Sequence, residues 1–140
     1  MKERPVLKKI VDSFWMILLI LALFNIARGL FHAFAPDSGA GSVAHLDLSS
    51  NAQNIIFLIA AIGIHQVALG CFQLLIALRA RQFVLHAFVI DFILLILPRL
   101  YDKPPASSFP GLVAHNIELF IVILILAVFA LSRAGISSRS

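Results

Sequence analysis

Four long apolar stretches divide the chain, and each is bounded by short polar or proline- and glycine-containing segments. They cover residues of about 11–35, 53–78, 82–97 and 111–131, and the third, which contains Asp91, is the shortest. A bilayer core of about 30 Å is crossed by a helix of about 20 mainly apolar residues. Because the connections are short, neighbouring helices should pack antiparallel. The pattern predicts an all-α integral membrane protein, an up-down-up-down four-helix bundle forming a single membrane domain over residues 1–140.

The segments between the stretches carry residues that end or begin helices. Ala35 to Gly39 contains a proline and a glycine, which interrupt helical hydrogen bonding. Ser50 and Gln53 have the spacing of a capping box at the start of the second helix. The run Arg79-Ala80-Arg81 predicts a tight, charged turn between the second and third helices.

The composition agrees with a membrane protein. Hydrophobic residues make up 61% of the chain, against about 45–50% in soluble domains, and charged residues 13%, against about 25%. These values argue against a soluble globular domain, a disordered chain or a nucleic-acid-binding domain, although the net charge is +4. The single cysteine, Cys71, excludes an internal disulfide.

The basic residues predict the orientation, since cytoplasmic loops are enriched in lysine and arginine. Eight of them fall on one side of the predicted membrane: Lys2, Arg4, Lys8, Lys9, Arg79, Arg81, Arg133 and Arg139. Only Arg99 and Lys103 fall in the loops on the other side. We therefore expect a multi-pass protein of the bacterial inner membrane with both ends of the chain in the cytoplasm, and segments 36–52 and 98–110 facing outward.

Polar side chains inside the spans are the strongest functional signal, because such groups are costly at membrane depth and usually face the bundle interior or a wet cavity. Asn25, Arg28 and His32 are spaced i, i+3 and i+7, which places them on one helix face. At about 1.5 Å per residue, Arg28 and Glu118 lie at about the same depth. Since the first and fourth helices of a closed bundle are neighbours, an Arg28–Glu118 ion pair is expected.

The predicted binding residues come from all four spans and should line a polar pocket that opens outward. They are Arg28, His32, Asp91, His115, Glu118, Asn25, His65 and Gln66. A second pattern, Gly63, Gln66, Gly70 and Gln73, forms a stripe of small and polar residues along one helix face. Such stripes are typical of close helix packing in membranes, and that interpretation is preferred for this set.

Two short sequences resemble the DoxX family and related small four-helix bacterial membrane proteins. One is Asn25-Ile26-Ala27-Arg28-Gly29-Leu30 before the outer loop, and the other is Gln66-Val67-Ala68-Leu69-Gly70 followed by Arg79-Ala80-Arg81. The likeness covers the first three helices, and the fourth by topology only. It implies an inner-membrane partner of quinone or thiol redox systems, and no functional residue is carried over from it.

Several chemistries stay open on these residues. His32 and His115 are placed at matched depth for a haem, and with Glu118 and Asp91 they have the ligand types of a zinc or iron site. No Gly-x-Ser-x-Gly motif supports nucleophilic catalysis. The sequence therefore leaves cofactor, metal and enzymatic activity undetermined.

Three functions remain. The first is an accessory bundle, or one that binds a small hydrophobic or anionic ligand; Arg28 would bind an anionic or carbonyl group of that ligand, and Glu118 would orient it. The second is a redox, metal- or haem-dependent membrane enzyme subunit. The third is an oligomeric proton-coupled transporter that uses Asp91 or Glu118. In each case the expected partners are the lipid bilayer and other membrane subunits or further copies of the chain, and no nucleic acid.

Overall fold

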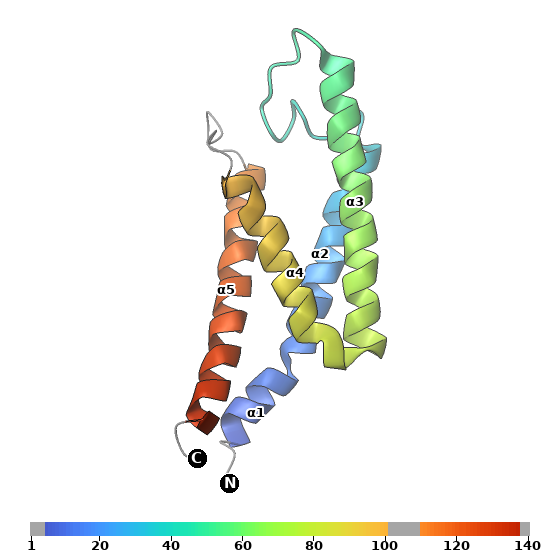
Figure 1. The fold of residues 1–140 in the computed structure, drawn as a ribbon. Helices are drawn as coiled ribbons and strands as arrows, with labels where there is room; N and C mark the ends of the chain where they lie inside the picture. The colour runs from blue at the N-terminus through green and yellow to red at the C-terminus, as the bar shows by residue number, and fades with distance from the viewer. Residues whose placement is uncertain (1–4, 101–109, 138–140) are drawn as a thin grey trace.

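The computed structural model describes residues 5–100 and 110–137, and all regular structure within them is helical. The elements are α1 (Pro5–Asp12), α2 (Phe14–Phe34), α3 (Ala52–Arg79), η1 (Arg81–Phe83), α4 (Val84–Ile96), η2 (Leu97–Leu100) and α5 (Pro110–Ser137). Figure 1 shows α1, the last turns of α5 and the α3–α4 turn at one end of the molecule, which we call the terminal end. The segment between α2 and α3 lies at the opposite end, the loop end.

Three segments are long and apolar enough to cross a membrane: Lys9–Phe34, Ala52–Arg79 and Val113–Ser132. In the most apolar 18-residue stretch of each segment, the share that is buried inside the molecule is only 28%, 11% and 22%, respectively. Most of the apolar surface of these helices therefore faces outward, as expected where lipid rather than protein surrounds a helix.

The first and third predicted helices differ from the structure. The first is broken at Ser13, whose hydroxyl donates to the carbonyl oxygens of Lys9 at 3.1 Å and Ile10 at 2.8 Å, so a short α1 precedes α2. The third is an α-helix of 13 residues with a 3-10 turn at each end. At about 1.5 Å per residue it is about 20 Å long. Pro98 limits it, since proline lacks the amide hydrogen that a continuing α-helix requires.

Glycines bring the backbones of α2 and α3 into contact. A Cβ atom added to Gly29 would lie 2.6 Å from the carbonyl oxygen of Gly63, and one added to Gly63 would lie 2.7 Å from that of Gly29. A Cβ atom on Gly70 would lie 2.8 Å from the carbonyl oxygen of Ala22. The prediction that this stripe allows close helix approach is confirmed for Gly63 and Gly70.

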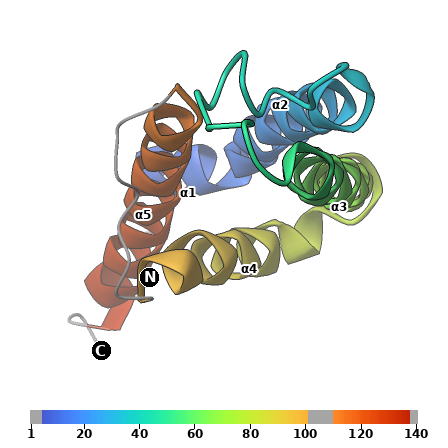
Figure 2. The ribbon, with the colours of Figure 1, turned by 90° about the horizontal axis from the view of Figure 1, so that it is seen from above.

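Helix α4 connects this tight pair to α5. Seen from above, α2 and α3 lie side by side, and α4 extends from the pair toward α5 (Figure 2). A hydrophobic core joins α2, α3, α4 and α5, and its residues include Phe14, Leu18, Ile76, Phe88 and Val122. The rings of Phe14 and Phe88 meet edge to face, with centroids 6.5 Å apart.

The segment at the loop end is organised by Asp37. Its carboxylate accepts hydrogen bonds from the amide of Gly39 at 2.9 Å, from the amide of Gly41 at 3.2 Å, and from the amide and hydroxyl of Ser42 at 2.7 and 3.0 Å. The amide groups of Ser42 and Gly39 are the main reason that the pKa of Asp37 lies below its usual value. The predicted capping box is wrong: Asn51 is the N-cap of α3, with φ 56°, and makes no side-chain cap.

Candidate functional site

Four polar side chains meet in the interior of the molecule, one each from α2, α3, α4 and α5. They are Asn25 of α2, Gln73 of α3, Asp91 of α4 and Glu118 of α5, with exposed fractions of 2%, 1%, 3% and 6%. We call these four residues the polar cluster. Asn25, Asp91 and Glu118 were predicted as site residues, and the structure brings these three together.

The helical period explains how each residue reaches the interior. Asn25 continues the buried stripe formed by Leu18, Leu21 and Ala22 in α2, and Gln73 lies between Gly70 and Ile76 in α3. Residues spaced three or four apart share one helix face. In the same way Asp91 follows Phe88 in α4, and Glu118 precedes Leu119 and Val122 in α5. Each polar residue therefore stands on the face that its helix turns inward.

Two amides link the two carboxyl groups into one hydrogen-bonded chain. The Asn25 side-chain nitrogen donates to Gln73 Oε1 at 3.1 Å and to Glu118 Oε1 at 3.4 Å. The Gln73 side-chain nitrogen in turn donates to both carboxyl oxygens of Asp91 at 2.8 Å. All four helices are thus joined through a single network. Among the described residues, every buried side-chain nitrogen or oxygen has a hydrogen-bond partner.

The charge of the polar cluster defines its chemistry. Within the residues the structure describes, no lysine, arginine or histidine contacts the two carboxyl groups. Two ionised carboxylates would place two unpaired negative charges in an apolar interior, which is strongly unfavourable. A proton or a small cation removes this cost, so the arrangement is suited to bind one.

Arg28 lies one helical turn from Asn25 toward the loop end, yet it does not contact Glu118. With the Gln66 amide oriented so that its oxygen faces the guanidinium, Arg28 Nε donates to that oxygen at 3.2 Å. The guanidinium also lies 5.6 Å from the centre of the Phe24 ring. The prediction of an Arg28–Glu118 ion pair is therefore wrong, because the two side chains have different partners. The close approach of α2 and α3 brings Gln66 within reach of Arg28, while Glu118 lies at the level of Asn25.

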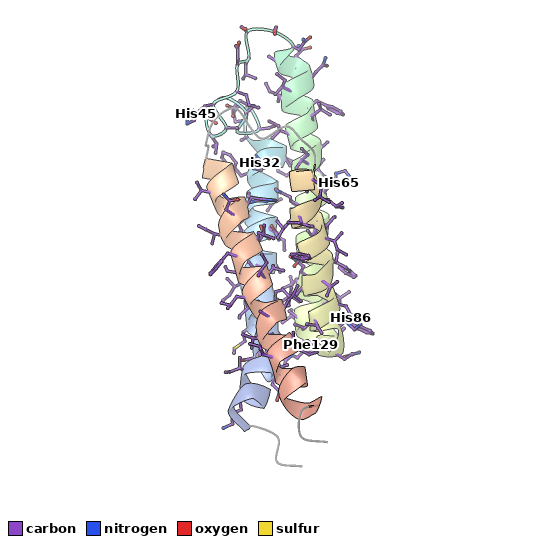
Figure 3. The ribbon with its side chains drawn as sticks, turned by 60° about the vertical axis from the view of Figure 1, so that its left-hand side comes forward. His32, His45, His65, His86 and Phe129 are labelled. Carbon is purple, nitrogen blue, oxygen red and sulfur yellow. The ribbon has the colours of Figure 1, made fainter. Side chains whose placement is uncertain are left out.

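The three predicted histidines are separate from the polar cluster and from one another. His32 Nδ1 donates to the Ser38 carbonyl at 2.7 Å and so fastens the loop end. His115 Nε2 donates to the Leu95 carbonyl at 3.1 Å, between α5 and α4. His65 Nδ1 donates to the Ala61 carbonyl of its own helix at 2.7 Å. It is exposed, and Figure 3 shows it on the outer surface of α3.

Metal-ligating side chains do not gather in the described parts of the chain. Residues 5–100 and 110–137 contain no group of three or more histidine, cysteine, aspartate or glutamate side chains that could hold a metal ion. The predicted set of His32, His115, Glu118 and Asp91 is divided between the loop end, the α4–α5 contact and the polar cluster.

Gln73 is the member of the polar cluster that was not predicted as a site residue. It donates to Asp91 and accepts from Asn25, so it holds the centre of the network. Its place in the stripe with Gly63, Gln66 and Gly70 was the available signal. That stripe was interpreted as a packing surface, and the structure shows that it both packs α3 against α2 and carries a polar group to the interior.

Comparison with known proteins adds no further constraint: no protein-family model, curated protein or solved structure matches the chain. The resemblance to the DoxX family stays a prediction from the residues that carry it. The functional conclusion therefore depends on the geometry of the polar cluster.

Proposed function

We propose that this chain is a membrane-embedded, up-down-up-down four-helix protein that binds and releases a proton at Asp91 and Glu118, and that it acts in proton-coupled transport. The three membrane-length apolar helices support its insertion. Lys9, Arg79 and Arg81 lie at the terminal end, which supports a cytoplasmic position for that end in a bacterial inner membrane.

One observation carries the proposal: two buried carboxyl groups share a network that contains no cation among the described residues. Arg28, the arginine of α2, is bonded to Gln66 and does not pair with either carboxyl group. Instead the carboxyl groups are held by amides, which can donate to a carboxylate and can also accept from a protonated carboxyl. The network therefore tolerates a change of protonation.

Protonation at this position alters the hydrogen bonds that join the four helices. The hydrogen bonds of Asn25 and Gln73 are side-chain links among four helices, and one added proton converts a carboxyl acceptor into a donor. Intramembrane acidic residues that change protonation are typical of proton relays in transporters. The ligand-binding and redox alternatives lack a comparable observation, because Arg28, His32 and His115 are bonded to groups of the protein itself.

Proton flux into liposomes tests the proposal. The full chain is reconstituted with a pH-sensitive dye inside the vesicles, and a pH gradient is imposed. We expect the wild type to dissipate the gradient faster than empty vesicles, and Asp91→Asn and Glu118→Gln each to reduce the rate to that of empty vesicles. Asp47→Asn is the matched control, since Asp47 is an exposed loop carboxylate bonded to Ser49. Equal flux in all four proteins would refute the transport role.

Infrared spectroscopy separates proton binding from transport. The carbonyl stretch of a protonated carboxyl is resolved from that of a carboxylate, and its change with pH is followed in the reconstituted protein. We expect the titrating signal of the wild type to include a component that is lost in Asp91→Asn or Glu118→Gln and kept in Asp47→Asn, which removes only an exposed carboxyl. A titrating band without flux would overturn transport alone. The absence of both signals would make the polar cluster a purely structural link between helices.

A further inference from the structure

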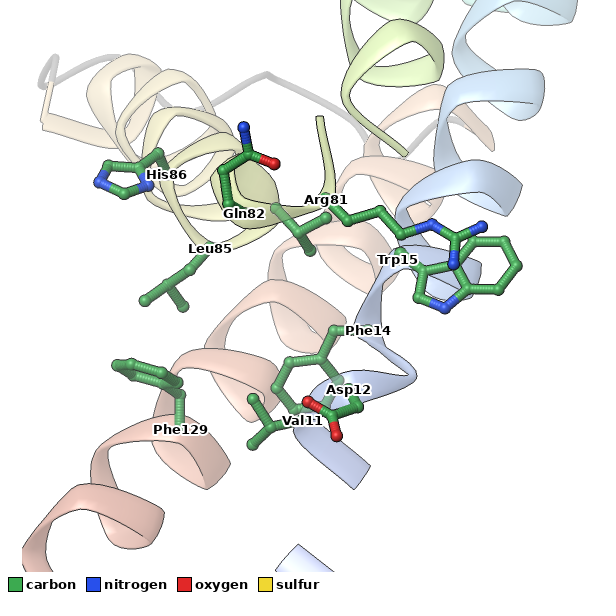
Figure 4. A pocket seen from close by; sticks show the side chains of 10 residues that line it. Val11, Asp12, Phe14, Trp15, Arg81, Gln82, Leu85, His86 and Phe129 are labelled. Carbon is green, nitrogen blue, oxygen red and sulfur yellow. The ribbon is translucent and has the colours of Figure 1, made fainter. Parts of the chain in front are cut away.

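A pocket separate from the polar cluster opens at the terminal end of the molecule. It has a volume of about 520 Å³ and lies between α1, the start of α2, the η1–α4 segment and α5 (Figure 4). This volume is within the range of about 300–1,000 Å³ that is common for small-molecule sites. None of the predicted site residues lines it.

The walls of the pocket are divided between apolar and charged groups. The apolar wall is formed by side chains from three different helices, Phe14, Leu85 and Phe129. Opposite charges are supplied by Arg81 and Asp12. Figure 4 shows Leu85 and Phe129 on one side of the pocket and Arg81 on the other. An apolar wall beside charged groups, at the end of membrane-length helices, fits an amphiphile with a polar headgroup.

Arg81 lines the pocket and is held in a fixed orientation by two neighbours. Its Nε donates to the Ala77 carbonyl at 3.2 Å, and its guanidinium carbon lies 3.8 Å from the centre of the Trp15 ring. Stacking and one hydrogen bond fix the plane of the group. Of the five N–H donors of its guanidinium group, only the one on Nε has a protein acceptor among the described residues. The other N–H groups are available to donate hydrogen bonds to the oxygens of a phosphate.

Asp12 decides which phosphate-containing headgroup fits. Among the described residues that line the pocket, Asp12 is the only carboxylate and Arg81 the only arginine or lysine, so the formal charges of these two residues cancel. Gln82 and His86 add further polar groups. A headgroup with net negative charge would bring a second negative group toward Asp12, whereas one that carries both a phosphate and an ammonium can satisfy each charge.

We propose that this pocket binds a phospholipid with a phosphoethanolamine headgroup. The phosphate contacts Arg81, the primary ammonium contacts Asp12, and an acyl chain lies against Leu85 and Phe129. The site depends on the membrane insertion proposed above but not on proton binding by the polar cluster. The ammonium matters because its N–H groups donate to a carboxylate, which a choline headgroup cannot do.

Native mass spectrometry of the full chain released from vesicles tests this site. The vesicles contain equal amounts of phosphatidylethanolamine, phosphatidylcholine and phosphatidylglycerol. We expect the wild type to retain phosphatidylethanolamine about tenfold over phosphatidylcholine, the ratio given by one hydrogen bond to a charged group. Asp12→Asn should reduce this ratio to near one, and Arg81→Gln should reduce retention of all three lipids.

Two further variants keep the result independent of folding. Leu85→Trp fills the apolar part of the pocket without changing charge and should also lose the lipid. Arg79→Gln removes a nearby exposed arginine that does not line the pocket, and it should behave like the wild type. Circular dichroism confirms the helical content of each variant.

The possible outcomes separate this site from the proposed function. Equal retention of the three lipids, or a preference for phosphatidylglycerol that Arg79→Gln and Arg81→Gln reduce alike, would overturn the site and leave proton binding intact. A phosphatidylethanolamine preference in a protein without proton flux would support the site and overturn only transport. Extraction of the chain from vesicles at alkaline pH would overturn membrane insertion, and with it both proposals.

Discussion

Replacing Gln73 by leucine tests whether its amide holds the polar cluster together. The substitution removes the two 2.8 Å contacts to Asp91 and the 3.1 Å contact from Asn25. At about 0.6 kcal/mol for an average hydrogen bond between membrane helices, the three contacts contribute about 2 kcal/mol. The Asp91 carboxyl then loses its amide donor in the interior, which costs about 1–3 kcal/mol more. We expect Gln73→Leu to lower the free energy of unfolding by about 3–5 kcal/mol.

The double variant Gln73→Leu/Asp91→Leu makes the expectation sharper. Removing both partners leaves no Asp91 carboxyl without its amide donor, and Asn25 keeps its 3.4 Å contact with Glu118 Oε1. Replacing a polar pair by apolar groups of similar size is often nearly neutral. The double variant should therefore be more stable than Gln73→Leu alone. If Gln73 and Asp91 instead contributed independently to stability, the double variant would be less stable than either single variant.

Unfolding by increasing fractions of a denaturing detergent measures these differences. Circular dichroism follows the helices, and fluorescence of Trp15, the single tryptophan, follows the start of α2. Gln53→Leu is the matched control, because Gln53 is an exposed glutamine of the same helix and its replacement should change stability by no more than about 0.5 kcal/mol. Equal effects of Gln73→Leu and Gln53→Leu, or additive effects in the double variant, would refute the reasoning.

Three other predictions concern the α2–α3 contact and the loop end. Gly63→Val should destabilise the protein by at least about 1–3 kcal/mol, because its Cβ would lie 2.7 Å from a backbone oxygen of α2. The control variant Ala68→Val, on the exposed face of α3, should not destabilise it. Detergent unfolding measures the stability of both variants. Because hydrogen bonds lower the pKa of Asp37 below 3.8, its stabilisation of the loop is complete above that pH and is lost as the pH falls through the lowered pKa. The midpoint of the pH-dependent shift of the Ser42 amide resonance should therefore lie below pH 3.8, and a midpoint above that pH would contradict this. His32→Ala removes the donor to a carbonyl 2.7 Å away, so amide hydrogen exchange across residues 35–46 should accelerate, and unchanged exchange would show that the loop does not depend on this contact.

The helices themselves were largely predictable from the order of the residues. Apolar length, proline and glycine positions and the charged turn at Arg79 to Arg81 located all four apolar segments, because helical hydrogen bonds and transfer into an apolar environment are properties of each segment alone. The break at Ser13 and the 3-10 turns at the two ends of α4 were missed. Both depend on local backbone geometry that leaves no clear mark in the apolar pattern.

The polar cluster was only partly predictable. The expectation that polar groups within the apolar segments face the interior is confirmed for Asn25, Asp91 and Glu118. The partner of Arg28 was wrong, because depth does not say which neighbouring helix faces a side chain. That depends on the rotation of each helix and on the close contact that Gly29 and Gly63 allow.

The sequence by itself therefore determined that the chain forms apolar helices with ionisable groups at intermediate depth and basic residues toward one end. Only the tertiary structure decided that Gln73 would connect Asp91 to Asn25, that His32 would hold a loop rather than line a pocket, and that Arg81 and Asp12 would share a pocket. The physical reason is that a helix forms from interactions within one segment. A hydrogen bond between helices requires two segments to be positioned to within a fraction of an ångström, which packing against every other helix sets.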